Sequence, residues 1–190
     1  MAWLLIGLVL FLGIHSVSIV ARPWRNAQIA QRGERAWKGL YTVVSLVGIV
    51  LIVYGYAVAR QSPMVLYTPP SWTRHLALLL MLPVFPLLFA SSLPGRIKTA
   101  AKHPMLLATK LWALAHLLAN GTLADVLLFG GFLVWAVVDR IAVKRRPLPA
   151  VAVGPVRPMN DVIALVGGLL VYAVFVSWAH AWLFGVSPLR

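Results

Sequence analysis

The chain has 190 residues, of which 61% are hydrophobic and only 11% are charged, which leaves too few polar side chains to cover a soluble domain. It contains no cysteine, which excludes disulfides, zinc fingers, iron–sulfur clusters and a cysteine nucleophile. The formal net charge is +13, but nearly all the basic residues lie in short loops between apolar runs, as membrane orientation requires. We therefore expect one integral-membrane domain over residues 1–190, with the lipid bilayer as its partner and no nucleic acid.

Six segments are apolar and long enough, or nearly so, to cross a bilayer core of about 30 Å as a helix. The composition therefore predicts an all-α bundle of six transmembrane helices. A Pro-rich stretch, residues 145–158, is predicted to be irregular, and a tight turn is predicted at residues 120–122. In chain order the six segments are residues 3–21, 39–59, 76–93, 104–120, 123–143 and 162–183.

Individual residues indicate how these helices bend and pack. Pro83 and Pro86 predict a kink in the third segment. The fourth segment is the weakest prediction, because it is short and carries Lys110 and His116. The second segment has small residues near one face, which predicts a closely packed neighbouring helix. These small residues are Ser45, Gly48, Gly55 and Ala59.

The loop charges predict the orientation of the chain. Thirteen of the 17 Lys and Arg residues lie on one side of the predicted membrane and three on the other, with Lys110 inside it. This bias predicts cytoplasmic basic loops and both termini outside the cytoplasm. The first segment has no charged region before it and no clear cleavage site after it, so we expect a retained helix rather than a signal peptide.

Ionisable side chains inside a membrane are costly, so the five histidines are the first candidates for a site. His75 is expected at the outer interface, His103 at the inner end of the fourth helix and His180 near the outer boundary. His15 and His116 are deeper. A rise of 1.5 Å per residue places His15 about 18 Å, and His116 about 10 Å, from the outer boundary.

Helical phase puts each deep histidine on a face suited to a bundle interior. Phe11 and His15 share a face of the first helix, and Trp112, His116 and Asn120 share a face of the fourth. Two neutral imidazoles from facing helices are what a six-coordinate haem needs, and the aromatic side chains can pack its macrocycle. The alternative is that each histidine only hydrogen-bonds a Ser, Asn or backbone carbonyl of a neighbouring helix.

Basic residues can complete such a site by pairing with haem propionates. Arg22 and Arg25 are within reach on the inner side, and Arg74 on the outer side. The candidate cofactor site therefore consists of His15 and His116 as iron ligands, with Phe11, Trp112, Asn120 and Arg22 around them. The sequence has no pair of histidines four residues apart on one helix and no cluster of histidines and carboxylates. Their absence argues against a zinc or di-iron site.

Three stretches of the chain resemble the NnrU family of membrane proteins. They are Leu-Gly-Ile-His-Ser at residues 12–16, Arg-Ala-Trp-Lys-Gly-Leu-Tyr at residues 35–41, and residues 102–121. The last stretch carries the combined His-Pro and Leu-Ala-His-Leu-x-x-Asn-Gly pattern, which is fairly specific. The resemblance covers essentially the whole chain. It implies a bacterial inner-membrane protein associated with denitrification, in particular nitrite and nitric oxide reduction.

The NnrU family is in turn similar to 15-cis-zeta-carotene isomerase, a membrane enzyme with a redox-sensitive haem b. The resemblance implies haem b here as well, with axial ligands that map to His15 and His116. It also implies a small gaseous or lipophilic ligand, and leaves isomerase-like activity on a polyene open. The isomerase has a cysteine, implicated in ligand switching, three residues before the second histidine, where this chain has Ala113.

Two other functions fit parts of the sequence. One is a membrane accessory factor of the nitrogen-oxide pathway that binds no cofactor. The other is a small methyltransferase, because the Lys-His-Pro-Met element at residues 102–105 resembles an Arg-His-Pro element of integral-membrane methyltransferases. Those enzymes contact S-adenosylmethionine through acidic residues late in the chain, and here only Asp161 follows residue 139.

Overall fold

The computed structural model describes residues 1–145 and 155–189, and these residues form helices and connecting turns. The chain folds as two compact units, the first made of Met1–Tyr67 and Gly121–Arg145 and the second of Thr68–Asn120 and the described residues beyond position 154. The all-α prediction is confirmed. The prediction of an irregular stretch at residues 145–158 falls largely on residues 146–154, outside the described residues.

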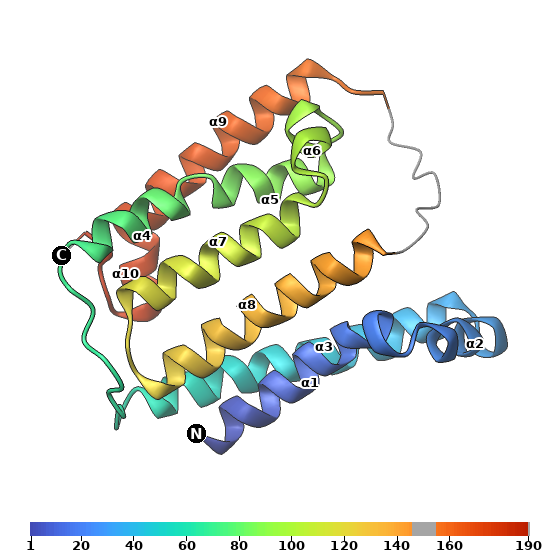
Figure 1. The fold of residues 1–190 in the computed structure, drawn as a ribbon, viewed down its shortest axis with the longest axis horizontal. Helices are drawn as coiled ribbons and strands as arrows, with labels where there is room; N and C mark the ends of the chain where they lie inside the picture. The colour runs from blue at the N-terminus through green and yellow to red at the C-terminus, as the bar shows by residue number, and fades with distance from the viewer. Residues whose placement is uncertain (146–154, 190) are drawn as a thin grey trace. The chain divides into compact units, whose positions relative to one another are not determined.

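The first unit is a group of three long helices with one short helix at one end (Figure 1). α1 packs along α3, and α8 packs along α1. α2 connects α1 to α3 and contacts both. The bounds are α1 (Ala2–Val20), α2 (Arg22–Arg32), α3 (Glu34–Ala59) and α8 (Leu123–Lys144).

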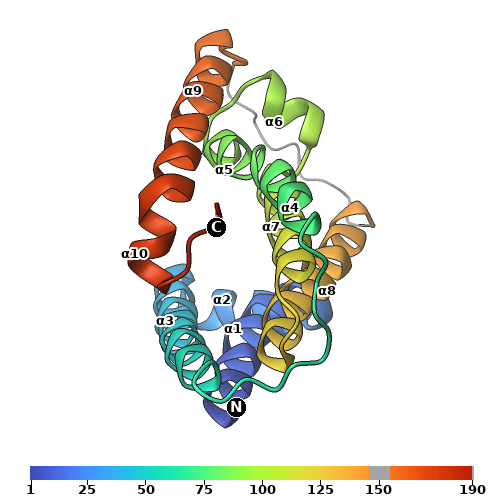
Figure 2. The same ribbon diagram turned by 90° about the vertical axis from the view of Figure 1, so that its left-hand side faces the viewer.

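Glycines bring α1 and α3 into backbone contact, as the small-residue face of the second segment predicted. A Cβ atom added at Gly48 would lie 2.9 Å from the Cβ of Phe11, and one added at Gly7 would lie 2.6 Å from the backbone nitrogen of Ile52. A Cβ at Gly55 would overlap the backbone of Leu4. Figures 1 and 2 show the two helices side by side. Close packing of this kind is a main source of helix association in lipid.

A buried carboxylate fixes the other end of the first unit. The Asp125 side chain accepts a hydrogen bond from the Tyr56 hydroxyl at 2.5 Å and from the Thr122 backbone N–H at 2.9 Å. Thr122 and Asp125 form a capping box at the start of α8, which satisfies backbone donors that the helix itself leaves open. These bonds join α3 to α8 and compensate the burial of Asp125, which is 4% exposed.

The second unit contains the proline-rich third segment, which the structure divides into two helices. α4 ends at Met81 and α5 begins at Val84, so the predicted kink is confirmed at Pro83. α5 packs against α9, where Gly168 lies directly on the backbone of Pro86. The helices are α4 (Thr73–Met81), α5 (Val84–Ser92), α6 (Arg96–Ala101), α7 (Pro104–Ala119), α9 (Pro158–Val174), the π-helical turn η1 (Phe175–Ala179) and α10 (His180–Phe184).

The start of α9 holds the loop that precedes α6. The two carboxylate oxygens of Asp161 accept hydrogen bonds from the backbone N–H groups of Arg96 and Ile97, each at 2.9 Å. The Asn160 side-chain amide donates to the Pro94 carbonyl at 2.8 Å. Asp161 is therefore engaged in capping α6, since the first N–H groups of a helix need acceptors from outside it.

Every predicted apolar segment forms a helix, and five of them are long enough to cross a membrane. α7, at 16 residues, is shorter than the usual span, so a total of six crossings stays a prediction, as does the orientation of the termini. The chain is a membrane protein of apolar helices. α2, α6 and the π-helical turn were not predicted. The five long spans are Ala2–Val20, Glu34–Ala59, Thr73–Ser92, Leu123–Lys144 and Pro158–Phe184.

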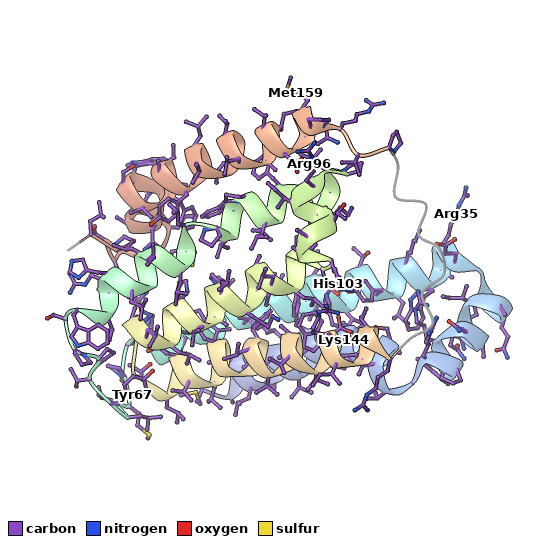
Figure 3. The ribbon with its side chains drawn as sticks, turned by 45° about the horizontal axis from the view of Figure 1, so that its top comes forward. Arg35, Tyr67, Arg96, His103, Lys144 and Met159 are labelled. Carbon is purple, nitrogen blue, oxygen red and sulfur yellow. The ribbon has the colours of Figure 1, made fainter. Side chains whose placement is uncertain are left out.

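Basic residues gather at one end within each unit. Figure 3 shows Arg35 and Lys144 at the same end of the first unit and Tyr67 at the opposite end. Within the second unit, Arg96 and His103 lie at the end where α9 begins (Figure 3). This grouping is what the count of loop charges requires of helices that cross a membrane.

The α1–α3 contact yields a direct test with a matched control on the same helix. We expect Gly55→Ala to lower the stability of the protein by about 1–3 kcal/mol, because the added methyl group must push the two backbones apart. A Cβ atom at Gly39 would meet nothing within 4 Å, so Gly39→Ala should be neutral or stabilising by up to about 1 kcal/mol. Thermal unfolding in detergent measures both; equal melting temperatures for the two variants would contradict the packing.

Candidate functional site

His15 lies at the centre of an aromatic cluster in the first unit. Its ring stacks on Phe11, with centroids 4.2 Å apart and an interplanar angle of 27°. Tyr41 of α3 lies 5.0 Å away, and Trp135 of α8 lies 5.8 Å away and meets the imidazole edge-on. Phe11 also contacts Phe132 of α8. The structure therefore confirms that the face carrying Phe11 and His15 points into the helix group.

A backbone hydrogen bond fixes the protonation pattern of the His15 ring. Its Nδ1 atom lies 2.6 Å from the carbonyl oxygen of Phe11, one helical turn earlier. A carbonyl oxygen only accepts hydrogen bonds, so Nδ1 must carry the proton. The lone pair of the neutral ring then belongs to Nε2. An imidazole held in this way has the form that ligates metals, because the second nitrogen is fixed by a backbone acceptor.

A cavity of about 310 Å³ opens beside His15. This volume is at the lower end of the range for small-molecule sites, about 300–1,000 Å³, so the cavity can enclose the edge of a large ligand rather than the whole of it. Its lining comes from α1, α2 and α3 and consists of Ile14, His15, Ser18, Arg25, Glu34, Trp37, Lys38 and Tyr41.

The charged residues of the cavity carry a net positive charge. Arg25 and Lys38 contribute two cations, and Glu34 contributes one carboxylate. Lys38 and Glu34 form an ion pair at 2.9 Å, with both side chains largely exposed. Arg25 is therefore the cation of the cavity that is not committed to this ion pair. The cavity combines an imidazole, aromatic walls and a cationic rim, which suits an apolar ligand with acidic groups.

Trp135 adds a buried donor next to the histidine. Its indole Nε1 is buried and has no hydrogen-bond partner among the described residues. A buried indole N–H normally finds a partner. The Trp135 ring, which carries this N–H group, lies on α8 and meets the His15 imidazole edge-on.

His116 has the same local geometry in the second unit. Its Nδ1 atom lies 2.8 Å from the carbonyl oxygen of Trp112, so Nδ1 again donates, and in the neutral ring the lone pair is on Nε2. The Trp112 ring is 5.3 Å from the imidazole. The Asn120 side-chain amide donates to the His116 carbonyl at 2.9 Å, which caps α7. Sequence reasoning thus grouped Trp112, His116 and Asn120 correctly, while the structure assigns the Asn120 amide to the helix end.

The other predicted residues have separate positions. Arg22 is exposed and is not part of the cavity lining, where Arg25 takes the inner position instead. His75 is exposed, as expected for an interfacial residue, and His103 is the residue before α7. The Nδ1 atom of His180 lies 2.7 Å from the Val186 carbonyl, between Phe175 and Phe184.

The cavity residues that sequence reasoning missed are Trp37, Lys38, Tyr41 and Glu34, together with Trp135. The α3 residues follow a helical spacing from Glu34 to Tyr41 that places them on one face, so this signal was present in the sequence. Trp135 carried no such signal, because its contact depends on how α8 packs on α1.

The donor set fits a macrocyclic metal complex better than a bare metal ion. In the part of the chain that the structure describes, no group of three or more His, Cys, Asp or Glu side chains could hold a metal ion. Structural and catalytic metal sites need three or four such donors. A porphyrin supplies four nitrogens itself, so one or two imidazoles are enough. An imidazole with a fixed Nε2 lone pair, aromatic walls and cations for propionates meets that requirement.

The assigned tautomers can be checked by NMR. We expect His15 and His116 to carry a proton on Nδ1, because each Nδ1 faces a backbone carbonyl, which only accepts hydrogen bonds. Two-bond ¹H–¹⁵N correlation spectra of the metal-free protein in detergent distinguish the tautomers, and His15→Gln and His116→Gln variants assign the signals. The exposed His75 serves as an internal reference. A proton on Nε2 of His15 would contradict the bond to Phe11.

Comparison with known proteins identifies the family. Neither the curated proteins nor the solved structures contain a significant match to the chain. The family model described as "NnrU protein" matches residues 3–188, which include both deep histidines and every helix from α3 to α10 in full. Given this coverage, the chain belongs to the NnrU family of proteins.

Proposed function

We propose that this NnrU-family membrane protein binds haem b and takes part in redox chemistry linked to nitrite and nitric oxide reduction in the bacterial inner membrane. The observation that carries the proposal is the hydrogen bond from His15 Nδ1 to the Phe11 carbonyl. It leaves Nε2 as the nitrogen with a lone pair in a half-buried, aromatic setting. The resemblance to a haem b isomerase, at the same two histidines, supports the same cofactor.

His15 would ligate the haem iron through Nε2 in this proposal. The Phe11 carbonyl accepts the Nδ1 proton, which holds the ring in one orientation and makes Nε2 a better donor to iron. Stacking on Phe11 and the edge-on contact with Trp135 limit rotation of the imidazole. A ligand held by three elements of the same unit costs little to order when the metal binds.

The cavity next to His15 serves the acidic edge of the cofactor. Arg25 and Lys38, which line it, would pair with propionate carboxylates, and Tyr41 and Trp37 would cover apolar surface of the macrocycle. The ion pair between Glu34 and Lys38 competes for one of these cations, so Arg25 is the principal partner. When bound, haem would supply one-electron redox chemistry.

His116 is the second residue that we propose as a ligand of haem iron. Its Nδ1 bond to the Trp112 carbonyl places a proton on the same ring nitrogen as in His15, and the Leu-Ala-His motif around it carries the resemblance to the isomerase. The Trp112 ring beside the imidazole would offer an aromatic surface for the macrocycle.

The structure weighs against two of the other functions. The isomerase cysteine is replaced by Ala113, which is completely buried, so ligand switching by a thiol has no counterpart at this position. A methyltransferase needs late acidic residues for S-adenosylmethionine, and Asp161 is already engaged with the backbone of α6. The accessory-factor function differs from the haem proposal only in lacking a cofactor, and the experiment below separates them.

The test is an absorption spectrum of protein purified from cells supplied with a haem precursor. We expect a Soret band in the wild type and in the exposed-site control His75→Ala. His15→Ala and His116→Ala should each lose most of this band, because each removes an imidazole that is proposed to ligate the iron. Size-exclusion chromatography verifies that each variant is folded.

A rescue variant keeps the test decisive if an alanine variant folds poorly. In His15→Gly, free imidazole added to the buffer should occupy the vacated position and restore the Soret band. A wild-type protein that contains no haem although haem is abundant would refute the proposal and favour the accessory factor. Variants that retain the full Soret band would refute the assigned ligands.

A further inference from the structure

α2 lies in the chain between two apolar helices and is tethered closely to both of them. A single residue, Ala21, separates it from α1, and a single residue, Gly33, separates it from α3. Both neighbours are long and apolar enough to span a membrane, and α2 packs against both of them. A polar helix tethered in this way has to lie where lipid headgroups meet water.

The composition of α2 suits this location. It contains Arg22, Arg25 and Arg32, no acidic residue and no fully buried residue. Trp24 is 52% exposed, and its ring meets the buried Trp37 of α3 edge-on at 5.8 Å. A half-exposed tryptophan that is anchored on one side is typical of the headgroup region, where one part of the ring is apolar and the other wet.

The cations at this end form two groups. Arg25 and Lys38 line the cavity beside His15. Arg22, Arg32 and Arg35 are exposed and lie outside that lining. The acidic side chain nearest to them in the sequence, Glu34, is bonded to Lys38. The outer group is therefore a concentration of positive charge that the neighbouring carboxylate does not neutralise.

We propose that Arg22, Trp24, Arg32 and Arg35 form a binding surface for anionic phospholipid headgroups, here called the α2 surface. Each guanidinium can pair with a lipid phosphate through two parallel N–H donors, while Trp24 inserts between headgroups. The surface selects lipids with a net negative charge over zwitterionic ones. This interaction goes beyond the proposed function and does not depend on haem.

The test measures hydrogen exchange of the α2 backbone in nanodiscs. With phosphatidylglycerol present, we expect amides of residues 22–35 to exchange about tenfold more slowly than in pure phosphatidylcholine, since a bound headgroup network stabilises the helix. The variant Arg22→Gln/Arg32→Gln/Arg35→Gln should lose this difference. The control variant Arg74→Gln/Lys102→Gln/Arg157→Gln removes the same charge from exposed positions of the second unit and should keep it.

A further arm separates lipid from free phosphate. Inorganic phosphate added to phosphatidylcholine nanodiscs should leave exchange unchanged; equal slowing by phosphate would overturn the assignment to lipid. Equal exchange of residues 22–35 in both lipids, or a difference that survives in the Arg22/Arg32/Arg35 variant, would overturn the α2 surface itself. The circular dichroism of each variant verifies that the helices remain intact. The His15→Ala variant should behave like the wild type, which separates this result from the fate of the haem proposal.

Discussion

The close approach of α1 and α3 is the contact on which the candidate site depends. Lipid offers no hydrophobic driving force between helices, so close packing at small residues is a main source of their association. Gly7 and Gly48 supply that contact over the turns that precede His15. With α1 fixed against α3, the imidazole meets Tyr41, and the cavity forms between these helices and α2. If α1 and α3 lay farther apart, the cavity would be lost although its lining residues were the same.

The same packing explains why the His15 ring keeps one orientation and one hydrogen-bonded nitrogen. A histidine in a helix can turn its Nδ1 toward the carbonyl one turn earlier, but the rotamer persists only if neighbours block the alternatives. Phe11, Tyr41 and Trp135 surround the ring at centroid distances between 4.2 and 5.8 Å. Local hydrogen bonding and long-range packing therefore act together to present one nitrogen for ligation. The recurrence of the Nδ1 bond at His116 extends this arrangement to the second unit.

The apolar helices could be predicted from hydropathy because the bilayer imposes a length and a composition on each of them. The proline kink and the small-residue face also followed from residue chemistry. α2 was missed because it is polar, although Pro23 at its start and Gly33 after its end are typical helix boundaries. The apolar pattern of the sequence gives no indication of the π-helical turn from Phe175 to Ala179. For the candidate site, the placement of both histidines within apolar helices could be predicted, while their role as iron ligands stays a prediction. Trp135 could not, because its position depends on contacts between helices far apart in sequence.

The proposed function depends on a haem b that is ligated by the imidazoles of His15 and His116. A reduced-minus-oxidised difference spectrum of the purified wild-type protein is its sharpest test. We expect the resolved α and β bands of a haem b after reduction. A featureless difference spectrum from protein produced with ample haem would contradict the proposal.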